Sequence, residues 1–238
     1  MFIVTSYIMK VFGDFGNIAP EMELMNRLTN IPGKVELLPG TANAVTFNAT
    51  KNEPQIKQCI HLEDKTKQWF LSIPFDGIDA GFNLKNNSAQ VDLNEVAVDT
   101  CGIMEHAVKA CNIGLGRIAV NCSMKVQAEK SEFISAFHNQ LVIPAEFQKG
   151  NECTEWQVTS NSPVIFDLSE DWTESVNVIC NTFRQSESIV VLLDINTTPY
   201  NMAPRFNESH LAMFNTKAIA LLETAKTEFE RKWNNVRC

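Results

Sequence analysis

Asp194 is the residue whose type and position come nearest to enzymatic chemistry. It lies near the end of the apolar run 189–196, Ile-Val-Val-Leu-Leu-Asp-Ile-Asn. Carboxylates at the ends of buried strands commonly hold metal ions in hydrolases and nucleases. That chemistry needs a second carboxylate and a nearby lysine or histidine, and no D…ExK or comparable set accompanies Asp194. The alternative is that Asp194 accepts hydrogen bonds from the turn at 196–201, as Asp commonly does at strand ends.

Other reactive residue types occur without the patterns that catalysis needs. Serine, cysteine and histidine are present, but there is no G-x-S-x-G elbow, and we expect His106 and His210 to be structural. Gly114 and Gly116 follow a predicted helix and precede a predicted strand, whereas a dinucleotide-binding loop needs the order strand, turn, helix. The sequence therefore predicts no catalytic set and no cofactor, with Asp194 as the alternative metal ligand.

The segment 196–206, Asn-Thr-Thr-Pro-Tyr-Asn-Met-Ala-Pro-Arg-Phe, is a candidate for recognition. It is rich in turn-forming residues and connects the most apolar predicted strand with the longest predicted helix. Tyr200 and Arg205 offer large contact areas with polar ends, which are favoured at protein interfaces. We predict that Asn196, Tyr200 and Arg205 bind a protein partner. The alternative is an ordinary connection that folds back on the sheet.

The composition is that of an ordinary globular protein. The 238 residues are 45% hydrophobic and 20% charged, with a formal net charge of −8, which excludes disorder and argues against nucleic-acid binding. Seven cysteines, an odd count, predict reduced thiols rather than disulfides. The N-terminus lacks the features of a secretion signal, and no apolar stretch reaches the roughly 18 residues of a membrane span. We expect a cytoplasmic protein without membrane contact.

Hydrophobic periodicity predicts the elements that must position these residues. Alternation predicts strands over 2–12, in several runs between 45 and 84, over 117–126 and around 156–166, and the apolar run at 188–195 predicts a buried strand. Spacings of three and four predict helices after Pro20, over 94–111, around Phe133, over 169–183 and from a cap at Asn207 to Trp233. The expected fold class is α+β, with mainly antiparallel sheet packed against amphipathic helices and a long C-terminal helix.

The sequence indicates the domain boundaries less clearly than it indicates the helices and strands. We divide the chain into an N-terminal α+β lobe at 1–126, a connecting segment at 127–151 and a C-terminal α+β lobe at 152–238, and a single domain is the alternative. Both halves show strands with helices between them, so a degenerate duplication stays open. The apolar stripe from Leu211 to Trp233 is expected to cover the sheet, and the alternative is that part of it forms a homo-oligomer seam.

Three short motifs occur in a characteristic order. A strand Arg117-Ile118-Ala119-Val120 is followed by a strand Leu192-Leu193-Asp194-Ile195 and by Phe229-Glu230 near the end of a long closing helix. This order resembles a sporadically distributed family of uncharacterised bacterial proteins of about this length. The resemblance implies a prokaryotic accessory protein from a defence locus, antiviral defence included, or from a toxin–antitoxin locus, and it implies no catalytic residue.

Two functions from different classes follow from these observations. The sequence favours a non-catalytic interaction protein, such as a sensor or adaptor that binds another protein. The alternative is a metal-dependent hydrolase or nuclease centred on Asp194.

Overall fold

The computed structural model describes residues 1–15, 17–31, 33, 35–48, 53–85, 90–142, 154–198 and 203–237. Its helices are α1 (Met22–Thr29), α2 (Leu93–Cys111), α3 (Ser131–Leu141) and α4 (Glu208–Arg237). Its strands are β1 (Ile3–Phe12), β2 (Leu37–Leu38), β3 (Thr41–Asn48), β4 (Glu53–Asp64), β5 (Trp69–Ile73), β6 (Gly77–Asn83), β7 (Arg117–Gln127), β8 (Gln157–Ser169), β9 (Trp172–Gln185) and β10 (Ser188–Thr197). The α+β class with mainly antiparallel sheet is confirmed.

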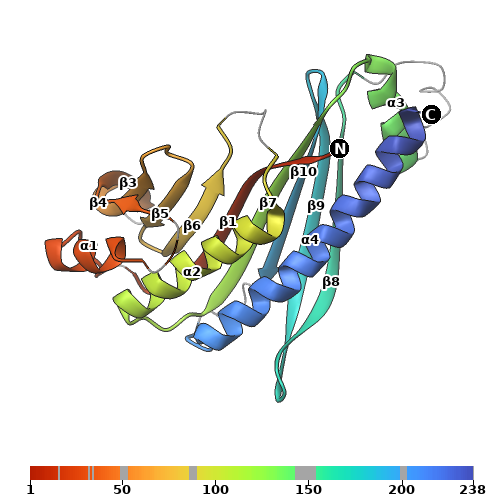
Figure 1. Cartoon of the computed structure of the whole chain (residues 1–238). Helices are drawn as coiled ribbons and strands as arrows, with labels where there is room; N and C mark the ends of the chain where they lie inside the picture. Colours follow the sequence, from red (N-terminus) through yellow and green to blue (C-terminus); the bar gives the residue numbers. More distant parts are fainter. Residues whose placement is uncertain are drawn as a thin grey trace.

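All ten described strands belong to one antiparallel sheet, in the order β2-β4-β5-β6-β1-β7-β10-β9-β8, and β3 pairs with β4 beside β2. Strands of the predicted N-terminal and C-terminal lobes are joined by the long pairing of β7 with β10. Figure 1 shows α2 and α4 crossing the same face of this sheet. On the opposite face, Leu192 and Ile165 are exposed.

The order of elements occurs twice along the chain. The first half runs β1-α1-β4-β5-β6-α2, with β2 and β3 added after α1, and the second runs β7-α3-β8-β9-β10-α4. Counted outward from the centre of the sheet, the strand orders are β1-β6-β5-β4 and β7-β10-β9-β8, and β1 pairs with β7 in antiparallel fashion. The described chain therefore consists of two similar halves, related by an approximate two-fold axis between β1 and β7.

The long helix that ends each half, α2 or α4, begins at a side-chain cap. The Asp92 carboxylate accepts hydrogen bonds from the backbone N–H groups of Asn94 and Glu95 at the start of α2. At the start of α4, the Asn207 side chain accepts a hydrogen bond from the N–H of His210, which confirms the predicted cap. Such caps satisfy N–H groups that have no partner within the helix.

The core lies between the sheet and these two helices. The Tyr7 hydroxyl of β1 donates a hydrogen bond of 2.6 Å to Asn215 Oδ1 of α4, and Asn215 Nδ2 donates to the Ala97 carbonyl of α2 at 3.2 Å. Burial raises the pKa of Tyr7 well above its usual value, and nearby Cys122 and Cys101 act in the same direction, so the hydroxyl stays a donor. Together these two hydrogen bonds connect β1 with α4 and α4 with α2.

The stripe of the C-terminal helix packs against the chain's own sheet. Leu211, Phe214, Leu222 and Trp233 are each at most 1% exposed. The expectation that this helix covers the sheet is confirmed, and Trp233 near its end packs against Phe133 and Phe137 of α3. In the described part of the chain, no helix is both long enough and apolar enough to cross a membrane. The five described cysteines are free thiols, as predicted for them.

The predicted helix over 169–183 is wrong, because this segment forms β9. Trp172, Val176, Ile179 and Phe183 have helical spacing, but in a strand the two even-numbered residues and the two odd-numbered residues lie on opposite faces. The segment is also rich in β-branched residues, which favour strands. It pairs along its length with β8 on one side and with β10 on the other. Long-range pairing thus overrides a helical pattern that the local sequence also fits.

Candidate functional site

Asp194 lies on the sheet face away from the helices, opposite Asn121 of β7 and Ile179 of β9. Its Oδ1 is buried and has no hydrogen-bond partner within the described chain. Among the described residues, no three histidines, cysteines, aspartates or glutamates come together as a metal-binding group. Asp194 therefore belongs to no such three-residue group within the described part of the chain.

Asn196 is only 3% exposed and serves an internal contact. Its Oδ1 accepts a hydrogen bond of 3.0 Å from Arg117 Nη2, and Arg117 Nε donates to the Thr197 carbonyl at 3.1 Å. The same guanidinium lies 4.7 Å from the centre of the Phe12 ring. Asn196 thus helps to fix Arg117 between β7 and β10.

Arg205 is also held by internal contacts. Its guanidinium forms an ion pair with Glu174 of β9, and the two side chains are 15% and 6% exposed. Arg205 Nε donates to the Gly116 carbonyl at 3.1 Å, and the guanidinium lies 4.4 Å from the Phe206 ring centre. Tyr200 lies outside the described residues. The binding role of segment 196–206 stays a prediction, but its two described candidates already have partners within the chain.

The two helical histidines make structural contacts. His106 Nε2 of α2 lies 2.7 Å from the Arg27 carbonyl at the end of α1. His210 is 8% exposed, and its ring centre lies 4.8 Å from that of Trp172. Each histidine thus joins two elements of the fold.

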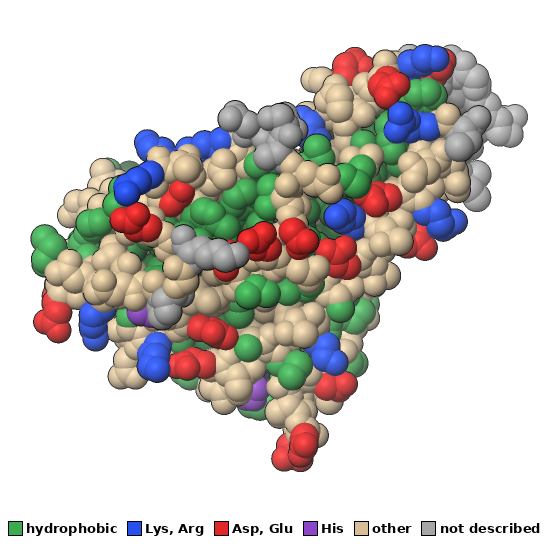
Figure 2. Space-filling view, viewed as in Figure 1, with side chains coloured by type: hydrophobic (Ala, Val, Ile, Leu, Met, Phe, Trp, Pro, Cys, Tyr) green, Lys and Arg blue, Asp and Glu red, His purple; other side chains and the backbone are tan. Residues whose placement is uncertain are grey.

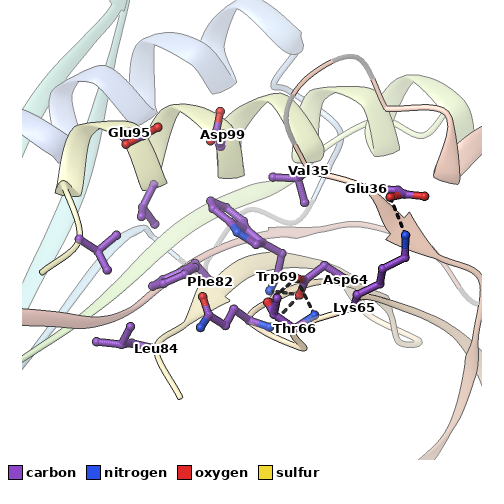
Figure 3. A pocket seen from close by; sticks show the side chains of 13 residues that line it. Val35, Glu36, Asp64, Lys65, Thr66, Trp69, Phe82, Leu84, Glu95 and Asp99 are labelled. Carbon is purple, nitrogen blue, oxygen red and sulfur yellow. Dashed lines mark hydrogen bonds and ion pairs between the residues drawn. The ribbon is translucent and has the colours of Figure 1, made fainter. Parts of the chain in front are cut away.

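A pocket of about 520 Å³ opens between α2 and the first half of the sheet. We call it the Trp69 pocket. Figure 3 shows Trp69 and Phe82 rising from the sheet below α2, with Glu95 and Asp99 on the helix above them. It is lined by residues of the 35–36 segment, the β4–β5 turn, the two following strands, residues 84 and 91, and the first turns of α2: Val35, Glu36, Asp64, Lys65, Thr66, Gln68, Trp69, Phe82, Leu84, Val91, Glu95, Val96 and Asp99.

The floor of the Trp69 pocket is aromatic because of the strand register. Trp69 of β5 is paired with Phe82 of β6, so both side chains project from the helix-facing side of the sheet. Their ring centres are 5.1 Å apart and the planes are inclined at 59°. Phe82 is 3% exposed, whereas Trp69 is half-buried, and both side chains line the pocket.

Asp64 fixes the turn that carries Trp69. Its carboxylate accepts backbone hydrogen bonds from Thr66 (3.0 Å), Gln68 (2.7 Å) and Trp69 (2.8 Å), and one from the Thr66 hydroxyl. Partial burial alone would raise the pKa of Asp64, but these hydrogen bonds outweigh it and hold the pKa below its usual value. Because the backbone N–H of Trp69 is one of the donors, the ionised Asp64 orients the start of β5.

The charged residues around the Trp69 pocket are mostly acidic. Among the described residues, four carboxylates line it (Glu36, Asp64, Glu95 and Asp99) against one ammonium group, that of Lys65. Lys65 Nζ lies 3.1 Å from Glu36 Oε2, so its charge is already balanced. Figure 2 shows hydrophobic side chains gathered beside α2, with acidic side chains along one border of this apolar area. The arrangement combines an apolar floor with a negative rim.

Nothing in the strand pattern marks Trp69 as part of a pocket, because Trp69, Leu71 and Ile73 alternate as the core face of a strand does. A weak signal lies on the helix. Glu95 and Asp99 are four residues apart, so both lie on one face of α2, on the same side of the apolar stripe that begins at Val96. A search of the chain against protein-family models finds no match, and a comparison with curated proteins finds no significant match.

Proposed function

We propose that this protein is a non-catalytic binding protein, a sensor or adaptor of a prokaryotic accessory system, and that it recognises a protein partner through the Trp69 pocket. A defence or toxin–antitoxin role is the setting that the family resemblance implies. The observation that carries the proposal is the half-buried Trp69 on a floor held in place by Asp64. Tryptophan is among the residues enriched at the hot spots of protein interfaces.

The pocket has the composition of a binding site. Phe82, Leu84, Val91 and Val35 supply apolar surface, and the carboxylates lie around it. Binding sites typically combine a mainly apolar lining with a few polar groups that fix orientation. The pocket holds no histidine or cysteine, so a nucleophile–base pair of those types is missing from its described lining.

Site-specific crosslinking tests the proposal. A photoreactive residue at position 36, on the rim of the pocket, is introduced into otherwise wild-type protein and into Trp69→Ala, and crosslinking is carried out in the native host. We expect one defined partner with the wild-type background and at least a tenfold loss with Trp69→Ala, because truncation of an interface anchor costs about 2 kcal/mol or more. Ile165→Ala is the matched control, since Ile165 is 64% exposed on β8, away from the pocket.

The competing enzyme function makes the opposite prediction. Asp194→Asn keeps the shape of the side chain and removes its charge. If Asp194→Asn abolishes cellular activity in a folded protein while Trp69→Ala keeps both activity and crosslinking, the binding proposal is wrong.

A further inference from the structure

In the second half of the chain, the space between the start of α4 and the sheet is filled by aromatic side chains. Phe206 precedes the N-cap of α4, His210 is the third residue after the cap and Phe214 the seventh. These three are 6%, 8% and 0% exposed. Trp172 lies 5.7 Å from Phe206 and 4.8 Å from His210 between ring centres, and Phe166 lies 5.4 Å from Phe214.

In the first half, the same three positions relative to the N-cap of α2 hold Val91, Glu95 and Asp99. All three line the Trp69 pocket. Trp69 is the first residue of β5 and Trp172 the first residue of β9, and each lies on the helix-facing side of the sheet. A smaller aliphatic residue and two carboxylates thus stand where the other half has an aromatic cluster. At these three helix positions the first half has an open pocket, whereas the second half has packed aromatic side chains.

We propose that the Trp69 pocket receives a basic side chain, lysine or arginine, from the protein partner. This inference rests on the proposed function and names the group that the site recognises. The apolar stem of such a side chain matches the floor of Trp69 and Phe82, and its charged head matches the carboxylates of Glu95 and Asp99. A cation close to the face of a tryptophan ring gains further electrostatic attraction.

The charged residues that face the pocket from elements other than α2 also favour a positively charged occupant. Asp64 is engaged with backbone donors of its own turn, and Glu36 and Lys65 balance each other. Glu95 and Asp99 supply two further carboxylates from the first turns of α2, and Glu95 also takes part in an interaction within the chain. The chain as a whole carries a formal net charge of −8, which attracts basic partners over a longer range. A polypeptide occupant fits because the corresponding helix positions of the second half, Phe206, His210 and Phe214, are packed against side chains of the chain itself.

An NMR titration at low ionic strength tests the inference. The probes are the peptides acetyl-Leu-Lys-Leu-amide and acetyl-Leu-norleucine-Leu-amide, which differ only in the terminal ammonium group. The readout is the indole N–H resonance of Trp69, assigned by its loss in Trp69→Phe. We expect the lysine peptide to shift this resonance with at least fivefold higher affinity than the norleucine peptide. In Glu95→Gln/Asp99→Asn, the lysine peptide should fall to the affinity of the norleucine peptide.

The control variant is Glu170→Gln/Asp171→Asn, which removes the same charge from the exposed β8–β9 turn. It should keep the preference for the lysine peptide, and an equal loss in this control would overturn the pocket as the source of selectivity. Equal affinity of the two peptides for the wild-type protein would overturn the basic side chain but leave the binding function standing. If 2-phenylethylammonium shifts Trp69 and neither peptide does, the polypeptide source is wrong. If none of the three probes shifts Trp69, both the inference and the pocket as recognition site fail.

Discussion

For the Arg205→Ala variant, the local sequence and the tertiary structure predict different losses of stability. An exposed arginine in a connecting loop can be truncated with a cost under about 0.5 kcal/mol. In the structure, however, the Arg205 side chain is 15% exposed and is paired with Glu174, which is 6% exposed. Arg205→Ala would leave the Glu174 carboxylate buried without its counter-ion and the Gly116 carbonyl without its donor.

The expected cost follows from that burial. Removing one partner of a buried ion pair typically destabilises a protein by about 3–5 kcal/mol. For a chain of this length, 1 kcal/mol corresponds to about 2–4 °C in Tm, so Arg205→Ala should lower the Tm by roughly 6–20 °C. Thermal unfolding followed by circular dichroism, with urea unfolding as a second measurement, gives both numbers.

A double variant controls for the charge itself. Arg205→Met/Glu174→Leu removes both charges and keeps apolar volume, so it should recover most of the stability that Arg205→Ala loses. If Arg205→Ala instead melts within about 2 °C of the wild type, the ion pair does not contribute to stability and Arg205 is free to bind a partner, as the sequence predicted.

Three further outcomes are expected. Tyr7→Phe should lower the free energy of unfolding by about 1–3 kcal/mol, because the buried Asn215 Oδ1 loses its donor, and Tyr7→Phe/Asn215→Leu should lose less than the sum of the two single variants. Phe214→Ala should cost about 3–5 kcal/mol and Phe229→Ala clearly less, since Phe214 is fully buried and Phe229 only half-buried; urea unfolding compares them. The hydrogen bonds to Asp64 lower its pKa, so the stability that the ionised carboxylate gives to the fold is fully present above about pH 4 and is lost as the pH falls through the folded pKa. The difference in unfolding free energy between the wild type and Asp64→Asn should therefore shrink as the pH falls from 5 into the acid range. A difference that does not change with pH would contradict this.

Elements with one clear hydrophobic period were predictable from the sequence. The helix over 94–111, the strand over 117–126 and the long helix capped by Asn207 agree with α2, β7 and α4 within one to four residues at their ends. In each case the buried face follows from the local spacing of apolar residues, which is set by the geometry of one element. The sequence also determined the acidic charge and the fold class, because these depend on composition and on the number and type of elements.

Tertiary pairing decided the rest. The segment 172–185 has helical spacing and strand-forming residues together, and only the neighbouring β8 and β10 make it a strand. Arg205 and Glu174 are 31 residues apart, so no local pattern could reveal that the loop arginine is neutralised within the chain. The Trp69 pocket depends on which residues of α2 face β5 and β6, and on the smaller or charged side chains that α2 has where the first turns of α4 have aromatic ones. A site formed between elements is set by contacts across the fold, and the one-dimensional spacing of residues does not contain them.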